Sequence, residues 1–141
     1  MSGPNTFYFG SASPGEGIQQ TVAVNYAANT DYNLTISVGT RIQDQFQSNL
    51  EMQILAGSTV IASQIASPGS PSTFVDHTLV HTATPANAAL YGQPLTIRLL
   101  ENGTQREVDI DNVRFSTTLV PEPSTLSLLP TLALFIFRRR K

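Results

Sequence analysis

The 141-residue sequence contains no cysteine and no tryptophan, and it has no lysine before its last residue. Without cysteine there can be no disulfide, no thiolate nucleophile and no thiolate metal site. Four of the eight cations are residues 138–141, so the preceding part has four arginines against all ten acids. A protein that binds nucleic acid needs Lys and Arg in numbers to displace the counterions of the phosphates. We therefore expect no nucleic-acid partner.

The part of the chain before residue 119 also lacks a sustained helical period, and it alternates between apolar and polar residues instead. The clearest case is the segment from Tyr32 to Val38, where every second residue is apolar. Side chains change face at each residue of a strand, so this pattern predicts a strand with one buried face. By the same reasoning we predict strands over residues 6–10, 17–26, 31–42, 49–55, 60–65, 73–84, 95–103 and 107–119.

Turn-forming residues separate these segments. Asn29 tolerates a left-handed backbone, Gly57-Ser58 fits a two-residue hairpin, and Asn102-Gly103 fits the last hairpin. Residues 67–72 read as a loop and residues 85–94 as a short helical turn. Together these signals predict an all-β fold for residues 1–118: an antiparallel two-sheet sandwich, most consistent with a jelly roll.

The last 23 residues have a different chemistry, and we predict that residues 119–141 form a separate C-terminal signal. Prolines on both sides of Glu122 predict an extended linker, because each proline lacks a donor and fixes φ. Residues 124–137 carry no charge and fit a helix of about 21 Å, with Pro130 as a kink. That length is short of the ~30 Å hydrocarbon layer, although snorkelling arginines could close part of the gap.

The order of these three parts resembles the PEP-CTERM sorting signal of Gram-negative bacteria that make exopolysaccharide. The sorting motif consists of Val120, Pro121, Glu122 and Pro123; the membrane segment contains Leu126, Leu128, Leu129, Leu132, Leu134, Phe135, Ile136 and Phe137; the basic stop is Arg138, Arg139, Arg140 and Lys141. A helix packed on its own domain, with a solubilising tail, is the alternative. The resemblance implies export, transient anchoring in the inner membrane, processing by the membrane protease exosortase, and release to the cell surface or extracellular matrix.

Members of that family begin with a signal peptide, and residues 1–15 lack the basic and apolar regions of one. We therefore expect that the true start lies upstream or that the sequence is a fragment.

Residues 17–115 also resemble jelly rolls of the galactose-binding, carbohydrate-binding-like type. The resemblance is most specific in "VDIDNVRFS", residues 108–116, which would close the domain. In such domains an acid of the closing strand often binds a structural calcium ion, which implies Asp111, with Glu16 as the acid near the N-terminus. The alternative is that Asp111 only accepts hydrogen bonds. We otherwise expect no cofactor.

Residues that could bind sugar or catalyse a reaction are sparse. Tyr32 falls on the core face, which leaves Tyr91 as the ring most expected to be exposed. His77 and His81 share a face but would lie about 13 Å apart on a strand, too far to share a metal ion. Asp109 and Asp111 share a face without an accompanying nucleophile, so a glycan-active enzyme is the weakest hypothesis.

The sequence therefore predicts an exported, non-catalytic surface or biofilm-matrix protein that is an exosortase substrate. The alternative is a polysaccharide-binding module that uses the jelly-roll body to bind exopolysaccharide.

Overall fold

The computed structural model describes residues 7–10, 13–40, 48–103 and 107–121. They form eight strands and one short 3₁₀ helix. The elements are β1 (Phe7–Gly10), β2 (Gly17–Asn25), β3 (Thr30–Gly39), β4 (Asn49–Ala56), β5 (Thr59–Ala66), β6 (Val75–Thr82), η1 (Pro85–Leu90), β7 (Pro94–Asn102) and β8 (Glu107–Leu119). The predicted strands and the predicted helical turn are thus confirmed, with small shifts at their ends.

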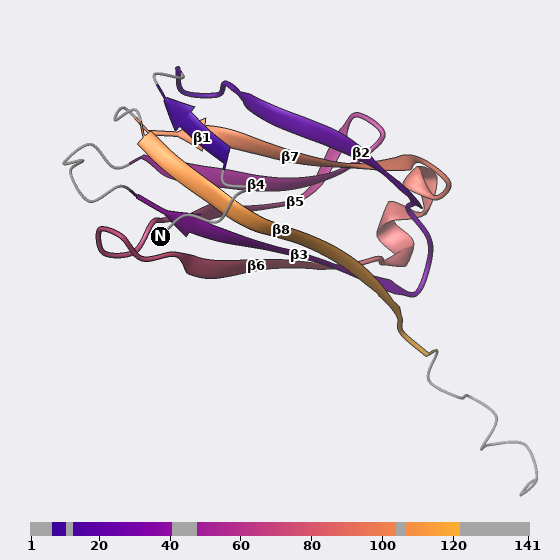
Figure 1. The fold of residues 1–141 in the computed structure, drawn as a ribbon. Coiled ribbons are helices and arrows are strands. Elements are labelled where there is room, and N and C mark those ends of the chain that lie inside the picture. The colour runs from indigo at the N-terminus through magenta and orange to yellow at the C-terminus, as the bar shows by residue number, and fades with distance from the viewer. Residues whose placement is uncertain (1–6, 11–12, 41–47, 104–106, 122–141) are drawn as a thin grey trace, which may run out of the picture.

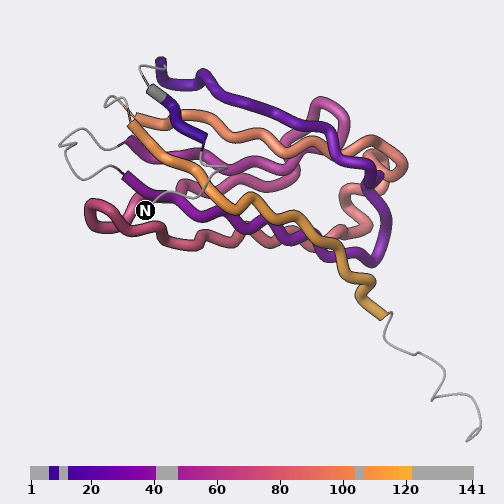
Figure 2. Tube along the Cα trace, viewed as in Figure 1, coloured from indigo at the N-terminus to yellow at the C-terminus, as the bar shows by residue number. Residues whose placement is uncertain are grey.

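The strands form two four-stranded antiparallel sheets that pack face to face (Figure 1). The first sheet has the order β1-β8-β3-β6, and the second has the order β2-β7-β4-β5. The predicted all-β antiparallel sandwich is therefore confirmed. The short helix η1 lies at the opposite end of the sandwich from the start of β8 (Figure 2).

The core consists of the inward faces of the two sheets. On β3 the apolar residues at alternate positions, from Tyr32 to Val38, are fully buried, as the period-2 pattern predicts. They meet the inward residues of the second sheet, such as Ile54 and Leu99. Burial of these faces is what holds the sheets together.

The predicted turns have the backbone that their residues favour. Asn29 has φ 51° and Gly57 has φ 59°, both in the left-handed region. The β4–β5 hairpin closes around Gly57, whose N–H donates to the carbonyl of Pro94. Such turns fix the register of the strands that they join.

The two sides of the sandwich differ. At one side β5 and β6, the last strands of their sheets, contact each other. At the other side the first sheet ends in β1, which pairs only with residues 107–110 of β8. Beyond Ile110, β8 has a neighbour on one edge, β3, in the part of the chain that the structure describes.

The core makes a first prediction. Leu34→Ala should lower the free energy of unfolding by about 2–5 kcal/mol, because it opens a cavity in a fully buried site. Asn33→Ala, on the outward face of the same strand, should change it by less than about 0.5 kcal/mol. Urea denaturation measures both, and equal losses would contradict the assignment of the two faces.

Candidate functional site

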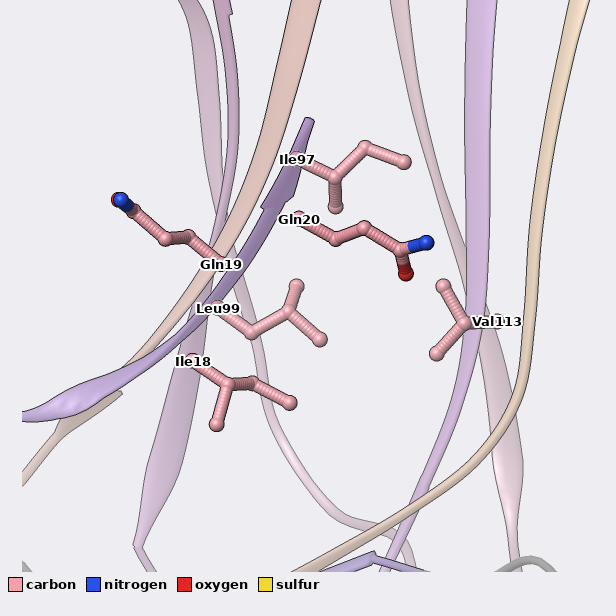
Figure 3. Close-up of a pocket in the computed structure, with 6 residues that line it drawn as sticks. All are labelled: Ile18, Gln19, Gln20, Ile97, Leu99 and Val113. Carbon is pink, nitrogen blue, oxygen red and sulfur yellow. The ribbon is translucent and has the colours of Figure 1, made fainter. Parts of the chain in front are cut away.

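A cleft lies between the two sheets on the side where they are not joined by β5 and β6 (Figure 3). Its volume is 190 Å³. Strands β2 and β7 of the second sheet form one wall, and β8 of the first sheet forms the other. The lining residues are Ile18, Gln19, Gln20, Ile97, Leu99 and Val113. We call this space the inter-sheet cleft.

The walls of the cleft are held in register by the pairing of β2 with β7. Ile18 lies opposite Leu99, and Gln20 lies opposite Ile97. Across the cleft stands Val113, which is 49% exposed. Four of the six lining residues are branched aliphatic, so the cleft offers apolar walls to a ligand.

A β-bulge in β8 turns Val113 into the cleft. In the pairing of β8 with β3, Asp111 lies opposite Ser37 but Arg114 lies opposite Thr35, so β8 contains one extra residue. Asn112 has φ 52° at this point. Because one added residue reverses which side chains face inward, Ile110 and Val113 both face the second sheet although they are three residues apart. Without the bulge, Val113 would face outward.

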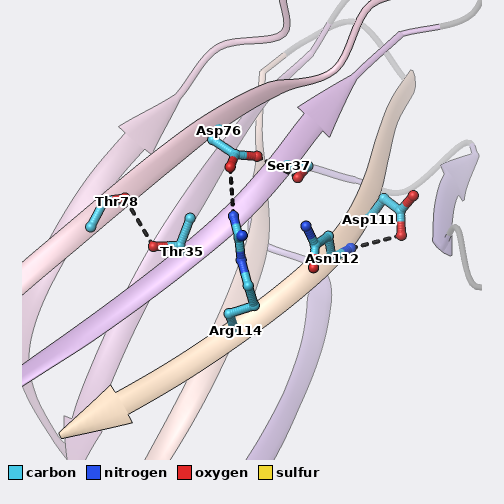
Figure 4. A network of polar contacts seen from close by, with 7 residues as sticks. All are labelled: Thr35, Ser37, Asp76, Thr78, Asp111, Asn112 and Arg114. Atoms are coloured by element: carbon cyan, nitrogen blue, oxygen red, sulfur yellow. Dashed lines mark hydrogen bonds and ion pairs between the residues drawn. The ribbon is translucent and has the colours of Figure 1, made fainter.

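The polar face of the same bulge lies on the outside of the first sheet (Figure 4). Asp76 accepts hydrogen bonds from the Ser37 hydroxyl at 2.5 Å and from the Arg114 guanidinium at 2.5 Å. The hydrogen bond from Ser37, and then that from Arg114, lowers the pKa of Asp76 below its usual value. The Asp111 carboxylate accepts the backbone N–H of Asn112 at 2.7 Å. The hydrogen bond from Ser37 links β3 to β6, and the ion pair with Arg114 links β6 to β8.

The structural calcium ion expected at Asp111 stays a prediction. Calcium takes six to eight oxygen ligands; Asp111 faces outward from the first sheet, and Glu16 precedes β2 of the other sheet. Glu16 accepts the backbone N–H of Ser13 at 2.9 Å. No group of three or more His, Asp or Glu that could hold a metal ion occurs in the described part of the chain.

An aromatic cluster closes the core near η1. Tyr26 packs against Tyr32, His81 and Tyr91, with ring centroids 5.4 to 5.7 Å apart. The Tyr26 hydroxyl and His81 Nε2 are 2.8 Å apart, and the Asn87 amide donates to the same hydroxyl. The tautomer of the His81 ring sets which of the two atoms donates, because the hydroxyl can both donate and accept. Burial lowers the pKa of His81 below its usual value.

The structure separates the histidines and covers the ring that the sequence predicted to be exposed. His77 Nε2 lies 2.9 Å from the carbonyl of Ser67, whereas His81 contacts Tyr26. Tyr91 is half-buried against Tyr26, and its hydroxyl donates to the carbonyl of Thr84. Tyr91 is therefore not the free aromatic platform that sugar binding would need.

A buried carboxyl adjoins the cleft along β7. Glu101 is the next inward residue after Leu99 and is 1% exposed. One of its oxygens accepts the Ser48 hydroxyl at 2.8 Å, and the other has no partner among the described residues. Glu107 accepts the hydroxyl of Tyr8. Sequence reasoning missed both carboxyls, although Glu101 shows a visible signal, an acid in an apolar alternating row.

The predicted tail lies almost entirely outside the described residues. Of the sorting motif, Val120 and Pro121 are described, and the Val120 N–H donates to the carbonyl of Asn29. The rest of the motif, the whole membrane segment and the basic stop lie beyond residue 121. Within the described ranges, no helix has the length and apolarity to cross a membrane.

A comparison with protein families shows the family to which the chain belongs. The family model of the HpiC1-like cyclases matches residues 1–116, which is most of the chain. The chain belongs to the HpiC1-like cyclase family. This family's match ends within β8, just after the bulge and the cleft residue Val113.

Solved structures of cyclases resemble this HpiC1-like chain. A cyclase from Fischerella sp. TAU in complex with 4-(1H-indol-3-yl)butan-2-one is 28% identical, with TM-score 0.70, over 85% of this chain and 67% of its own. The Stig cyclase Fisc from the same organism, in complex with (3Z)-3-(1-methyl-2-pyrrolidinylidene)-3H-indole, is 28% identical with TM-score 0.72, over 85% and 66%. This chain thus spans about two thirds of those proteins.

Other likenesses concern the fold alone. A structure described by the words "CBM4 structure and function" is 15% identical, with TM-score 0.60, over 83% of this chain and 74% of its own. No curated protein matches the chain.

The family match corrects the functional predictions made from the tail. The assignment to PEP-CTERM proteins was wrong, because the matching family is that of HpiC1-like cyclases. The non-catalytic matrix protein and the polysaccharide-binding module were wrong for the same reason, since cyclases are enzymes. The partners that followed from that assignment, exosortase and the inner membrane, were wrong with it, because the matching family and the similar structures are cyclases. The predicted export and the boundary at residue 118 stay predictions.

The bulge makes a second prediction. Asn112→Val should cost about 1–2 kcal/mol of stability, because a β-branched residue is strained in the left-handed region. Asn112→Gly should cost much less, since glycine adopts that backbone freely. Thermal unfolding compares the two variants, and a tolerated valine would show that the bulge does not require positive φ.

His81 makes a third prediction. Because its folded pKa lies below its unfolded value, the unfolded chain binds the proton first, and stability falls as pH drops from about 6.5 through the folded pKa. Urea midpoints between pH 7.5 and pH 5 should fall in the wild type and fall less in His81→Gln. His77→Gln is the matched control and should keep the wild-type slope. The idea fails if the slope is the same in all three proteins.

Proposed function

We propose that this chain is a cyclase that closes a ring within a small, flat, mainly apolar molecule held in the inter-sheet cleft. The match of the HpiC1-like cyclase family over residues 1–116 carries the proposal, because the matched range includes every residue of the cleft. The ligands named for the two Fischerella cyclases are a 1H-indole and a 3H-indole, both substituted at position 3. An indole-bearing substrate is therefore the class that we assign.

The size of the cleft supports a ligand of this kind. Pockets for drug-sized molecules usually have volumes of about 300–1,000 Å³, and this cleft has 190 Å³. It therefore suits one flat ring system, while the rest of the molecule extends past Ile18 and Val113 at the exposed rim.

The walls support catalysis by confinement. A cyclase must bring two parts of one flexible molecule into contact. Binding in the cleft already restricts the motion of the reacting groups, so less entropy is lost on reaching the transition state and the barrier is lower. Aliphatic side chains on both walls also exclude water from the reacting atoms. None of the six lining side chains ionises, so the contribution of the cleft itself is orientation and exclusion of water.

The proposal makes a fourth prediction, tested by binding of 4-(1H-indol-3-yl)butan-2-one. Val113→Phe should weaken binding at least tenfold, because the larger ring fills the cleft from the β8 wall. Val80→Phe is the matched control, since Val80 is 55% exposed and pairs with Asn33 on the outward face of β6.

Because the chain has no tryptophan, the emission of the ligand's indole reports binding without interference. Tight binding to wild type and to Val80→Phe, but not to Val113→Phe, is the expected result. Equal affinity of the two variants would place the ligand elsewhere, and a wild type that does not bind would remove the assigned substrate class.

A further inference from the structure

Gln20 interrupts the apolar row that β2 turns toward the cleft. The inward residues of this strand are Ile18, Gln20, Val22 and Val24, of which the two valines pack against the core. Gln20 points between the walls, toward Val113, while its neighbour Gln19 points away (Figure 3). A polar residue at an apolar position of a strand breaks the local pattern, and such breaks concentrate at functional sites.

Gln20 is exposed, so water hydrates its side-chain amide in the free protein. Within the part of the chain that the structure describes, this amide makes no hydrogen bond to another residue. An amide carries both an acceptor and a donor. A ligand that fills the cleft removes water from this amide, so the ligand must satisfy it or lose affinity.

We propose that Gln20 is the residue that determines substrate specificity, by accepting a hydrogen bond from the ring N–H of a flat heteroaromatic group. This inference rests on the proposed function, since it concerns the same cleft. The ring lies between Leu99 on one wall and Val113 on the other, where its faces meet only aliphatic carbon. Its edge then meets the Gln20 amide, which is the one polar group that enters from β2 between the walls.

The proposed hydrogen bond to Gln20 distinguishes two ligands that differ in a single ring atom. A ring with an N–H satisfies the amide oxygen, whereas a ring of the same shape with an oxygen in that place leaves the amide oxygen without a donor. Shape and apolar area are the same for both rings, so the difference in affinity isolates the hydrogen bond.

The experiment compares indole with 1-benzofuran by titration of the ¹⁵N-labelled full chain, followed by NMR. Wild type should bind indole about three- to tenfold more tightly than 1-benzofuran, the range of a net hydrogen bond. Gln20→Leu should bind both equally. Thr21→Val, changed on the outward face of the same strand and outside the lining of the cleft, should keep the wild-type preference.

Gln20→Glu keeps an acceptor oxygen at the same place and should keep the preference for indole. It serves as the second variant, should leucine at this position disturb the fold.

Two results contradict the inference, and they are distinguishable. If both ligands shift the amide signals of Leu99 and Val113 but wild type shows no preference, Gln20 does not determine specificity and the proposed function stands. If neither ligand shifts those signals, the cleft does not bind such rings, and the proposed function fails together with this inference.

Discussion

The pairing of β8 with β3 is the interaction on which the rest of the structure depends. It joins the last strand to the most deeply buried strand of the first sheet, and it contains one residue more on β8 than on β3. That extra residue switches which residues of β8 face inward, from even-numbered to odd-numbered positions. Before the bulge, Val108 and Ile110 face the core; after it, Val113 and Phe115 face the second sheet. The same strand, β8, therefore contributes residues to both the core and the cleft. Phe115 continues the row and packs on Tyr32, which ties the cleft side to the aromatic cluster near η1.

The same pairing accounts for the position of the polar groups. On the outer face, Asp76 and Arg114 bridge β6 to β8 over β3. Both side chains are about half exposed, so the bridge is screened by water and contributes little stability by itself. Its consequence is geometric, because it holds the outward face of β8 while the bulge directs Val113 inward. The cleft thus has one wall fixed by strand pairing and the other fixed by this network.

Much of the fold could be predicted from the sequence, because a half-buried strand leaves a period-2 signal. The segment around Leu34 shows it most clearly, and Asn29 and Gly57 mark turns whose backbone few other residues favour. The cleft could not be predicted in this way. Its walls combine Ile18 with Leu99 and Val113, which lie about 80 and 95 positions further along the chain, and no local pattern reports which strands become neighbours. The sequence "DIDNV" contained the bulge at Asn112, but alternation alone places Val113 on the wrong face.

The functional prediction failed for a related reason. The most distinctive local signal was the tail, and residues 122–141 lie outside the described structure. In the mechanism that we propose, aliphatic side chains orient the substrate, and such side chains form no motif of nucleophile, base or metal ligands in the sequence. The sequence signals that remain are polar residues in apolar rows, Gln20 on β2 and Glu101 on β7.

The central claim is that the inter-sheet cleft is where this cyclase-family chain binds its substrate. A crystal structure of the chain soaked with 4-(1H-indol-3-yl)butan-2-one tests it most directly. The account predicts the indole ring between Leu99 and Val113, with its N–H toward Gln20. Density for the ligand at another site, with the cleft empty at saturating concentration, would contradict it.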